Sequence, residues 1–177
     1  MAKMVGEMAH GNEIETKVKR YRAALITASN RAAKGEYLDD SGAILASGIA
    51  ELNFEIASQI VLPDDALLIS AEISRALSDE VDLIVTTGGT GISPTDITPE
   101  ATMGHIKQLL PGVSEALRAY GREKTALADL SRGLAGVNGK TLIINLPGSP
   151  NGVRDGLVIL KRMVAHILSQ LAGEDHK

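Results

Sequence analysis

The residue types that bind phosphates and divalent cations are concentrated in four short polar segments. Ser29 opens the first, Asp64 stands in the second, Gly88–Gly91 and Asp96 belong to the third, and Pro147–Ser149 form the fourth. Each segment follows a run of apolar residues typical of a buried strand. Ligands of parallel sheets bind beyond the carboxyl ends of the strands. We therefore expect the four loops to meet at one edge of the domain.

Two carboxylates are the main candidates for catalysis. Asp64 and Asp96 stand just past different strands, so they can face one cleft and hold a Mg²⁺ ion that bridges phosphate oxygens. The alternative is that each aspartate only caps the helix that follows it, because Asp is a favoured N-cap residue. Their association with glycine-rich loops favours the cation site.

The glycine loops offer backbone N–H groups that no side chain covers. The stretch Gly88-Gly89-Thr90-Gly91 suits a phosphate or the polar edge of a heterocycle. Glycines after a strand can equally form a tight turn with no ligand. The second loop, Pro147-Gly148-Ser149, has the same two interpretations, and the occurrence of two such loops favours binding.

Other chemistries are excluded by the sequence. The chain has no Cys, which excludes disulfides, thiolate zinc sites and thiol nucleophiles. Its four His residues lack ligand spacing, and no GxSxG nucleophile elbow is present. Leu134 stands where a phosphate-binding P-loop needs glycine, and Pro94 stands where a dinucleotide fingerprint needs glycine.

Composition limits the class of protein and of partner. The 177 residues are 44% hydrophobic, which is enough for one core. The formal net charge of -4 and an aromatic content of 2% argue against a basic or stacking surface for nucleic acid. No segment reaches the roughly 18 apolar residues of a membrane helix. We expect a soluble cytoplasmic protein without a nucleic-acid or membrane partner.

Strand and helix patterns alternate along the chain. Apolar runs predict strands at residues 22–28, 54–62 and 81–87. Apolar residues at helical spacing predict helices at residues 42–52, 64–77 and 152–171. A further helix is expected to start at Thr98 as cap, with Pro99 at its first position. Two strand-like runs, 130–137 and 140–146, are joined by Asn138-Gly139, which predicts a hairpin.

These patterns predict an α/β fold with a mostly parallel, doubly wound sheet, helices on both faces and an antiparallel edge hairpin. One domain is expected over residues 21–173. Residues 1–20 are interpreted as a disordered or expression-derived tail, and residues 174–177 as a C-terminal tail.

Three longer motifs resemble the molybdopterin-binding family, which includes molybdopterin adenylyltransferases and the corresponding domain of gephyrin. The motifs are LITASNRAAKGEYLDDSG (25–42), TTGGTGISPTDITPEAT (86–102) and LSRGLAGVNGKTLIINLPGSP (130–150). The resemblance covers roughly residues 22–171. It implies a three-layer α/β/α domain, a homotrimer, a molybdenum-insertion protein as partner, and Mg²⁺-dependent transfer of AMP from ATP to molybdopterin.

The resemblance also implies roles for individual residues. Asp64 and Asp96 match the catalytic and metal-binding carboxylates. Substrate-binding positions match Ser29, Asp40, Thr87, Gly88, Gly89, Thr90, Gly91, Ser131, Pro147, Gly148 and Ser149. Thr95 departs from the family pattern, where Arg is common, and so does Asn30, where Asp is common. A non-catalytic trimeric molybdopterin carrier and a nucleotide pyrophosphatase are the alternatives.

Overall fold

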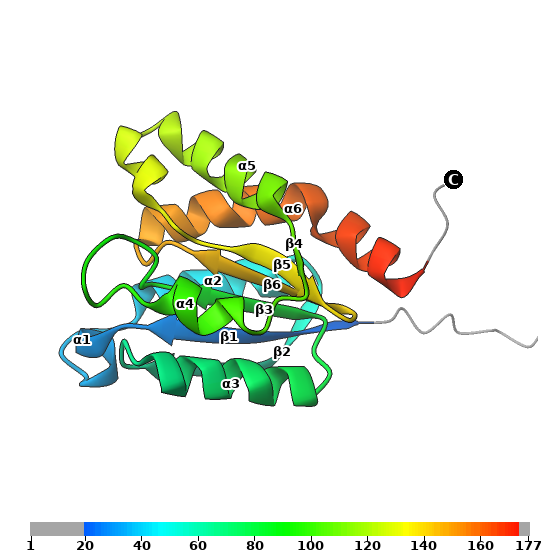
Figure 1. Cartoon of the computed structure of the whole chain (residues 1–177), viewed down its shortest axis with the longest axis horizontal. Coiled ribbons are helices and arrows are strands. Elements are labelled where there is room, and N and C mark those ends of the chain that lie inside the picture. Colours follow the sequence, from blue (N-terminus) through cyan, green and yellow to red (C-terminus); the bar gives the residue numbers. More distant parts are fainter. Residues whose placement is uncertain (1–19, 174–177) are drawn as a thin grey trace, which may run out of the picture.

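A computed structural model describes residues 20–173 of the chain (Figure 1). The strands are β1 (Tyr21–Ala28), β2 (Phe54–Leu62), β3 (Leu83–Thr87), β4 (Gln108–Leu109), β5 (Ala135–Asn138) and β6 (Thr141–Leu146). The α-helices are α1 (Asn30–Ala33), α2 (Asp40–Glu51), α3 (Ala66–Ser78), α4 (Thr98–Met103), α5 (Pro111–Arg122) and α6 (Pro150–Ala172), and η1 (Ala126–Leu130) is a 3₁₀ helix. The predicted tails lie outside the described residues, apart from Arg20. Within the described part, no helix is long and apolar enough to cross a membrane.

The strands form one sheet in the order β2-β1-β3-β6-β5-β4. The four strands β2, β1, β3 and β6 are parallel, whereas β5 and β4 are antiparallel to their neighbours. The chain crosses from β1 to β2 on one side and then to β3 on the other. This reversal beside β1 opens a crevice at the carboxyl ends of β1 and β3. The predicted parallel sheet with an antiparallel edge is confirmed.

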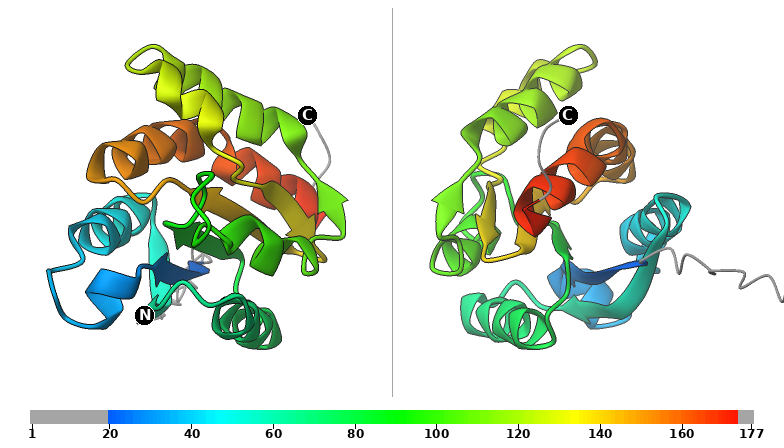
Figure 2. Two further views of the ribbon diagram at one scale, coloured as in Figure 1. Left: turned by 60° about the vertical axis from the view of Figure 1, so that its left-hand side comes forward. Right: turned by 90° about the vertical axis from the view of Figure 1, so that its right-hand side faces the viewer.

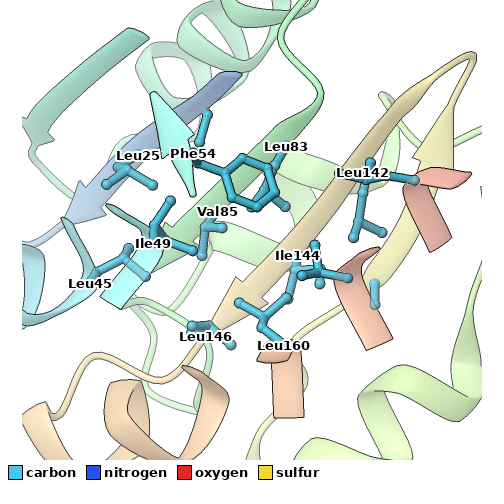
Figure 3. Close-up of a cluster of buried hydrophobic side chains, with 14 of the residues drawn as sticks. Leu25, Leu45, Ile49, Phe54, Leu83, Val85, Leu142, Ile144, Leu146 and Leu160 are labelled. Carbon is cyan, nitrogen blue, oxygen red and sulfur yellow. The ribbon is translucent and has the colours of Figure 1, made fainter. Parts of the chain in front are cut away.

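Helices cover both faces of the sheet, because alternate strand residues point to opposite sides. On one face, α2 and α6 pack on the strands, and α5 packs beside α6 and against β5 (Figure 2). Figure 3 shows the side chains buried in this layer, among them Leu25, Leu45, Ile49, Val85, Ile144 and Leu160. On the other face, α3 packs on the strands through Ile69 and Ile73. The predicted three-layer architecture is confirmed.

Short-range capping bonds set the ends of several elements. Asp39 caps α2 by accepting a bond of 2.8 Å from Gly42 N. Asp65 caps α3 by accepting from the backbone of Leu67 and Leu68. The predicted Asn138-Gly139 hairpin is present between antiparallel strands β5 and β6.

Three predictions about elements need correction. Thr98 is not the cap of α4, because Ile97 holds the cap position and Thr98 is already helical. Helix α6 begins at Pro150 rather than at about Gly152, since Ser149 accepts a hydrogen bond from Gly152 N and so caps the helix earlier. The hairpin strand β5 is not the edge of the sheet, because β4 pairs with it on the outside. Neither β4 nor α5 was predicted.

Candidate functional site

A cavity of about 780 Å³ lies at the carboxyl ends of the parallel strands. In Figure 1 this is the edge where α1 and the loop between β3 and α4 are drawn. The lining residues are Thr27, Ala28, Ser29, Asn30, Arg31, Tyr37, Leu38, Asp39, Asp40, Ser41, Asp64, Thr87, Gly88, Gly89, Thr95, Asp96, Gly148, Ser149 and Pro150. They come from the loops after β1, β2, β3 and β6 and from the start of α2 and α6. Four carboxylates and a single guanidinium, that of Arg31, are among them, so we name it the acidic cavity.

Asp64 is held at the acidic cavity by a reciprocal pair of hydrogen bonds. Its Oδ2 atom accepts from the backbone N–H of Asn30 at 3.1 Å, and its own N–H donates to Oδ1 of Asn30 at 3.1 Å. The next residue, Asp65, caps α3. The carboxylate of Asp64 is therefore not used as a helix cap, and it is available to a ligand.

Asp96 is likewise not a helix cap, because α4 has no side-chain cap. Its Oδ2 atom accepts from the backbone N–H of Ser93 at 2.8 Å, which folds the loop back on itself. A Cβ atom on Gly91 would lie 2.7 Å from the same oxygen, so the glycine allows this approach. The geometry places both aspartates in one cavity and excludes the alternative that each only caps a helix.

At the floor of the acidic cavity, the loops that follow β1, β3 and β6 lie very close together. Gly88 has a φ of +95°, and a Cβ atom there would lie 2.2 Å from the carbonyl oxygen of Ala28. A Cβ atom on Gly148 would lie 2.9 Å from the Cα atom of Gly88. Glycine is needed at both positions because any side chain would separate the ends of β1, β3 and β6.

Two hydroxyl groups fasten the 147–149 loop to its neighbours. Oγ1 of Thr87 donates to the carbonyl of Pro147 at 2.8 Å, and Oγ of Ser41 donates to the carbonyl of Gly148 at 2.7 Å. The loop is thus tied both to β3 and to the start of α2. Its position as a cavity wall is fixed by hydrogen bonds as well as by packing.

A second cavity of about 560 Å³ lies on the other side of this loop. Its lining residues are Thr90, Gly91, Ser114, Leu117, Arg118, Gly121, Lys124, Thr125, Leu127, Ala128, Leu130, Ser131, Gly133, Asn145, Pro147, Gly148, Ser149, Asn151, Gly152, Asp155 and Gly156. Most of them belong to α5, α6 and the segment between α5 and β5, so we name it the α5–α6 cavity. Gly148 and Ser149 line both cavities.

The α5–α6 cavity carries more positive than negative charge. Arg118 and Lys124 line it together with one carboxylate, that of Asp155. Lys124 donates a hydrogen bond to Asp155, and this bond raises the pKa of Lys124. Its Nζ atom also lies 4.9 Å from the centre of the Tyr120 ring. The ammonium group therefore stays charged at neutral pH.

Arg132 joins the walls of the two cavities. Its Nε atom donates to the carbonyl of Gly91 at 2.7 Å, and an Nη atom donates to the carbonyl of Asp96 at 2.6 Å. The remaining Nη atom pairs with Glu100, and this hydrogen bond lowers the pKa of Glu100. One guanidinium thus fixes the loop that carries Asp96.

The structure divides the predicted site residues between the two cavities. The acidic cavity receives Ser29, Asp40, Asp64, Thr87, Gly88, Gly89 and Asp96. The α5–α6 cavity receives Thr90, Gly91, Ser131 and Pro147. Gly148 and Ser149 belong to both. Ser131 is therefore not beside the two carboxylates.

Several lining residues were not predicted. Asp39 lines the acidic cavity next to the predicted Asp40, and its Oδ2 atom is buried with no hydrogen-bond partner among the described residues. Tyr37 also lines this cavity, and its hydroxyl lies 2.9 Å from Oγ of Ser29. The motif LDDSG offered a signal for Asp39. No local pattern marked Arg118 or Lys124.

The acidic cavity fits Mg²⁺ only together with a phosphate ligand. Within residues 20–173, no group of three or more His, Asp or Glu residues could hold a metal ion by itself. Mg²⁺ is usually bound by one or two carboxylates, waters and substrate phosphates. Oδ1 of Asp64 and Oδ1 of Asp96 accept no hydrogen bond from the described residues, so each is free for such a role.

Comparison with known proteins agrees with this geometry. Residues 24–166 match the family described as "Probable molybdopterin binding domain". A "Molybdopterin adenylyltransferase" of Helicobacter pylori is 38% identical, with 84% of this chain and 86% of the relative covered. A "Molybdenum cofactor biosynthesis bifunctional protein" of Chlorobaculum tepidum is 34% identical over 88% of this chain, and the chain spans about half of its length.

A solved structure has the same fold. The molybdopterin biosynthesis Mog protein from Mycobacterium ulcerans is 43% identical and has a TM-score of 0.83, with 88% of this chain and 99% of that chain covered. The family match covers well over half of the sequence. This chain belongs to the molybdopterin-binding family of molybdenum-cofactor biosynthesis proteins.

Proposed function

We propose that this protein transfers AMP from Mg-ATP to the terminal phosphate of molybdopterin, with release of pyrophosphate. The observation that carries the proposal is the pair of cavities that share Gly148 and Ser149. One cavity has two available carboxylates, and the other has two cationic side chains. Two anionic substrates bound on either side of the shared wall can bring their phosphates together. The name of the Helicobacter pylori relative supports the same reaction.

The reaction is a displacement at the α-phosphorus of ATP. An ionised oxygen of the molybdopterin phosphate forms a bond to the α-phosphorus, the bond from this phosphorus to the bridging oxygen of pyrophosphate breaks, and pyrophosphate leaves with the electron pair. No protein base is needed, because the attacking oxygen is already deprotonated near neutral pH. The protein contributes position and charge, through Arg118 and Lys124 for the attacking phosphate and the backbone N–H group of Gly89 for the triphosphate, since the N–H of Gly88 already donates to the carbonyl of Leu146.

Asp64 and Asp96 would hold the Mg²⁺ ion through their available Oδ1 atoms. When bound, Mg²⁺ neutralises the charge of the phosphoryl oxygens and of the departing pyrophosphate. The hydrogen bonds from Asn30 and Ser93 keep the two carboxylates facing the cavity.

The test is an assay of pyrophosphate after mixing the protein with molybdopterin and Mg-ATP. We expect release of pyrophosphate only when both substrates are present. Binding of molybdopterin without pyrophosphate would instead identify a carrier of the same family. Release of AMP from a dinucleotide in the absence of the pterin would identify a pyrophosphatase.

A homotrimer is part of the proposal. The family resemblance implies it, and apolar side chains such as Leu67 and Ile92, which are 81% and 68% exposed in the single chain and line neither cavity, are available for an interface. Sedimentation at micromolar concentration should give the mass of three chains. A monomer would remove this part of the proposal.

A further inference from the structure

The two aspartates of the acidic cavity are held in different ways. Asp64 stands just after β2, and its reciprocal hydrogen bonds with Asn30 tie it to the start of α1. Asp96 lies far from any strand, in residues 88–97, which join β3 to α4 (Figure 1). Residues 92–95 of this loop are exposed, so packing does little to fix the position of the second carboxylate.

One guanidinium supplies every hydrogen bond that joins residues 91–96 to a distant part of the described chain. Nε of Arg132 donates to the carbonyl of Gly91 at 2.7 Å, and an Nη atom donates to the carbonyl of Asp96 at 2.6 Å. The remaining hydrogen bonds of this segment lie within residues 93–96. Arg132 therefore holds both ends of the segment that carries Asp96.

Arg132 makes these contacts from outside both cavities. It lines neither of them, although its neighbours Ser131 and Gly133 line the α5–α6 cavity. Its own backbone N–H donates to the carbonyl of Thr90 at 2.8 Å, and an Nη atom pairs with Glu100. The guanidinium is thus not a phosphate ligand of either cavity, and any effect on the reaction must pass through the loop that it holds.

We infer that Arg132 is a positioning residue for Asp96 and sets the affinity of the acidic cavity for its cation. The guanidinium fixes the carbonyls of Gly91 and Asp96, and the N–H of Ser93 then orients the carboxylate through Oδ2. A planar guanidinium presents its donors in fixed directions and can bond both carbonyls at once, whereas the ammonium of lysine is a point charge that cannot reproduce this geometry. The inference rests on the proposed function in one respect, namely that Asp96 binds the cation.

The first measurement is amide hydrogen exchange in residues 91–97 of the protein without ligands. In Arg132→Lys the N–H groups of Ser93 and Asp96 should exchange about tenfold faster, because the loss of a hydrogen bond from a charged donor lowers local stability by at least this factor. Glu100→Gln is the matched control. It removes the ion pair but keeps both bonds to the carbonyls, so its loop should exchange like that of the wild type.

The second measurement is binding of Mn²⁺, followed by electron paramagnetic resonance in the presence of α,β-methylene-ATP. Arg132→Lys should weaken this binding about tenfold, because groups that orient metal ligands typically change metal affinity by about 10–100-fold. Glu100→Gln and Arg122→Lys should bind Mn²⁺ like the wild type. Arg122 also pairs with a carboxylate, that of Asp129, but it lies outside both cavities.

The outcomes separate positioning from a structural role. The Tm of Arg132→Lys should stay close to that of Arg122→Lys, because the loop that it releases is exposed. A much lower Tm, an unchanged loop exchange or an unchanged Mn²⁺ affinity in Arg132→Lys would overturn the inference, and so would a wild type that binds no Mn²⁺. An equal loss of affinity in Glu100→Gln would also overturn it, since the ion pair would then be the cause. A wild type that binds Mn²⁺ but releases no pyrophosphate would overturn the proposed function alone.

Discussion

The two cavities differ in charge although they share a wall. The acidic cavity is built from strand ends and short turns, and its charges are mostly carboxylates that loop hydrogen bonds hold in place. The α5–α6 cavity is built from two helices and the segment between α5 and β5, and it presents Arg118 and Lys124. Two anions of similar charge would repel each other in a single open pocket. Separate cavities let a bound cation neutralise one anion while protein cations neutralise the other.

This difference predicts that substitutions in one cavity impair one substrate selectively. Asp64→Ala or Asp96→Ala should lower pyrophosphate release by at least about 100-fold, because a metal ion contributes several kcal/mol to the transition state and about 1.4 kcal/mol is tenfold. Binding of molybdopterin, measured by fluorescence titration, should stay close to that of the wild type.

The matched control is the neighbouring carboxylate. Asp65→Ala removes the cap of α3 and should cost about 0.5–2 kcal/mol of stability without loss of activity. Full activity in both Asp64→Ala and Asp96→Ala would disprove the assignment of the acidic cavity.

A substitution at Gly148, which lines both cavities, should affect both of them. In Gly148→Ala the new Cβ atom would lie 2.9 Å from Cα of Gly88, so the backbone must move. We expect a destabilisation of about 1–3 kcal/mol in chemical unfolding. Affinities for ATP and for molybdopterin should fall together. Gly112→Ala is the control, because no atom lies within 4 Å of the added Cβ atom; as a helical Gly→Ala change it should leave the stability equal to or above that of the wild type and both affinities unchanged.

Removing a charge from the α5–α6 cavity should weaken the binding of molybdopterin and leave the binding of ATP unchanged. Lys124→Met removes a cation and leaves the charge of Asp155 uncompensated. We expect the KM for molybdopterin to rise about tenfold, which corresponds to about 1.4 kcal/mol, while the KM for ATP is unchanged. Lys161→Met, an exposed change on α6 outside both cavities, is the control. A rise in the KM for ATP alone would reverse the assignment of substrates to cavities.

Local patterns predicted most of the fold, because most strands and caps depend on nearby residues. Strands such as β1 and β3 are uninterrupted apolar runs. Helix α5 was missed because it contributes few apolar side chains to the core: Ser114 is its only fully buried residue, and Val113 and Leu117 are only partly buried. The pattern Thr-Pro-Glu fits Thr98 equally as cap or as first helical residue. Tertiary packing around Thr98 decides between them.

The candidate site was predicted in part. Loop positions after strands correctly indicated the region where Asp64 and Asp96 lie, because parallel strands end at one edge. The division into two cavities was not predictable, since it depends on how closely Gly148 approaches Gly88 and on the missed helix α5. For the same reason Ser131 could not be separated from the carboxylates by sequence alone.

The smallest expected effect concerns the ion pair between Arg132 and Glu100, which lies at the wall between the two cavities. The pKa of Glu100 lies below the ordinary value of 4.5 because Glu100 accepts a hydrogen bond from Arg132. The ion pair therefore stabilises the fold fully above about pH 4.5. This contribution is lost as the pH falls through the lowered pKa. Glu100 is 56% exposed, so Glu100→Gln should cost well under about 1 kcal/mol at pH 7. The difference from the wild type, measured by urea unfolding at several pH values, should vanish in acid. A difference that stays constant as the pH falls through the lowered pKa of Glu100 would mean that packing rather than charge joins Glu100 to Arg132, since a protonated Glu100 could no longer act as an anion.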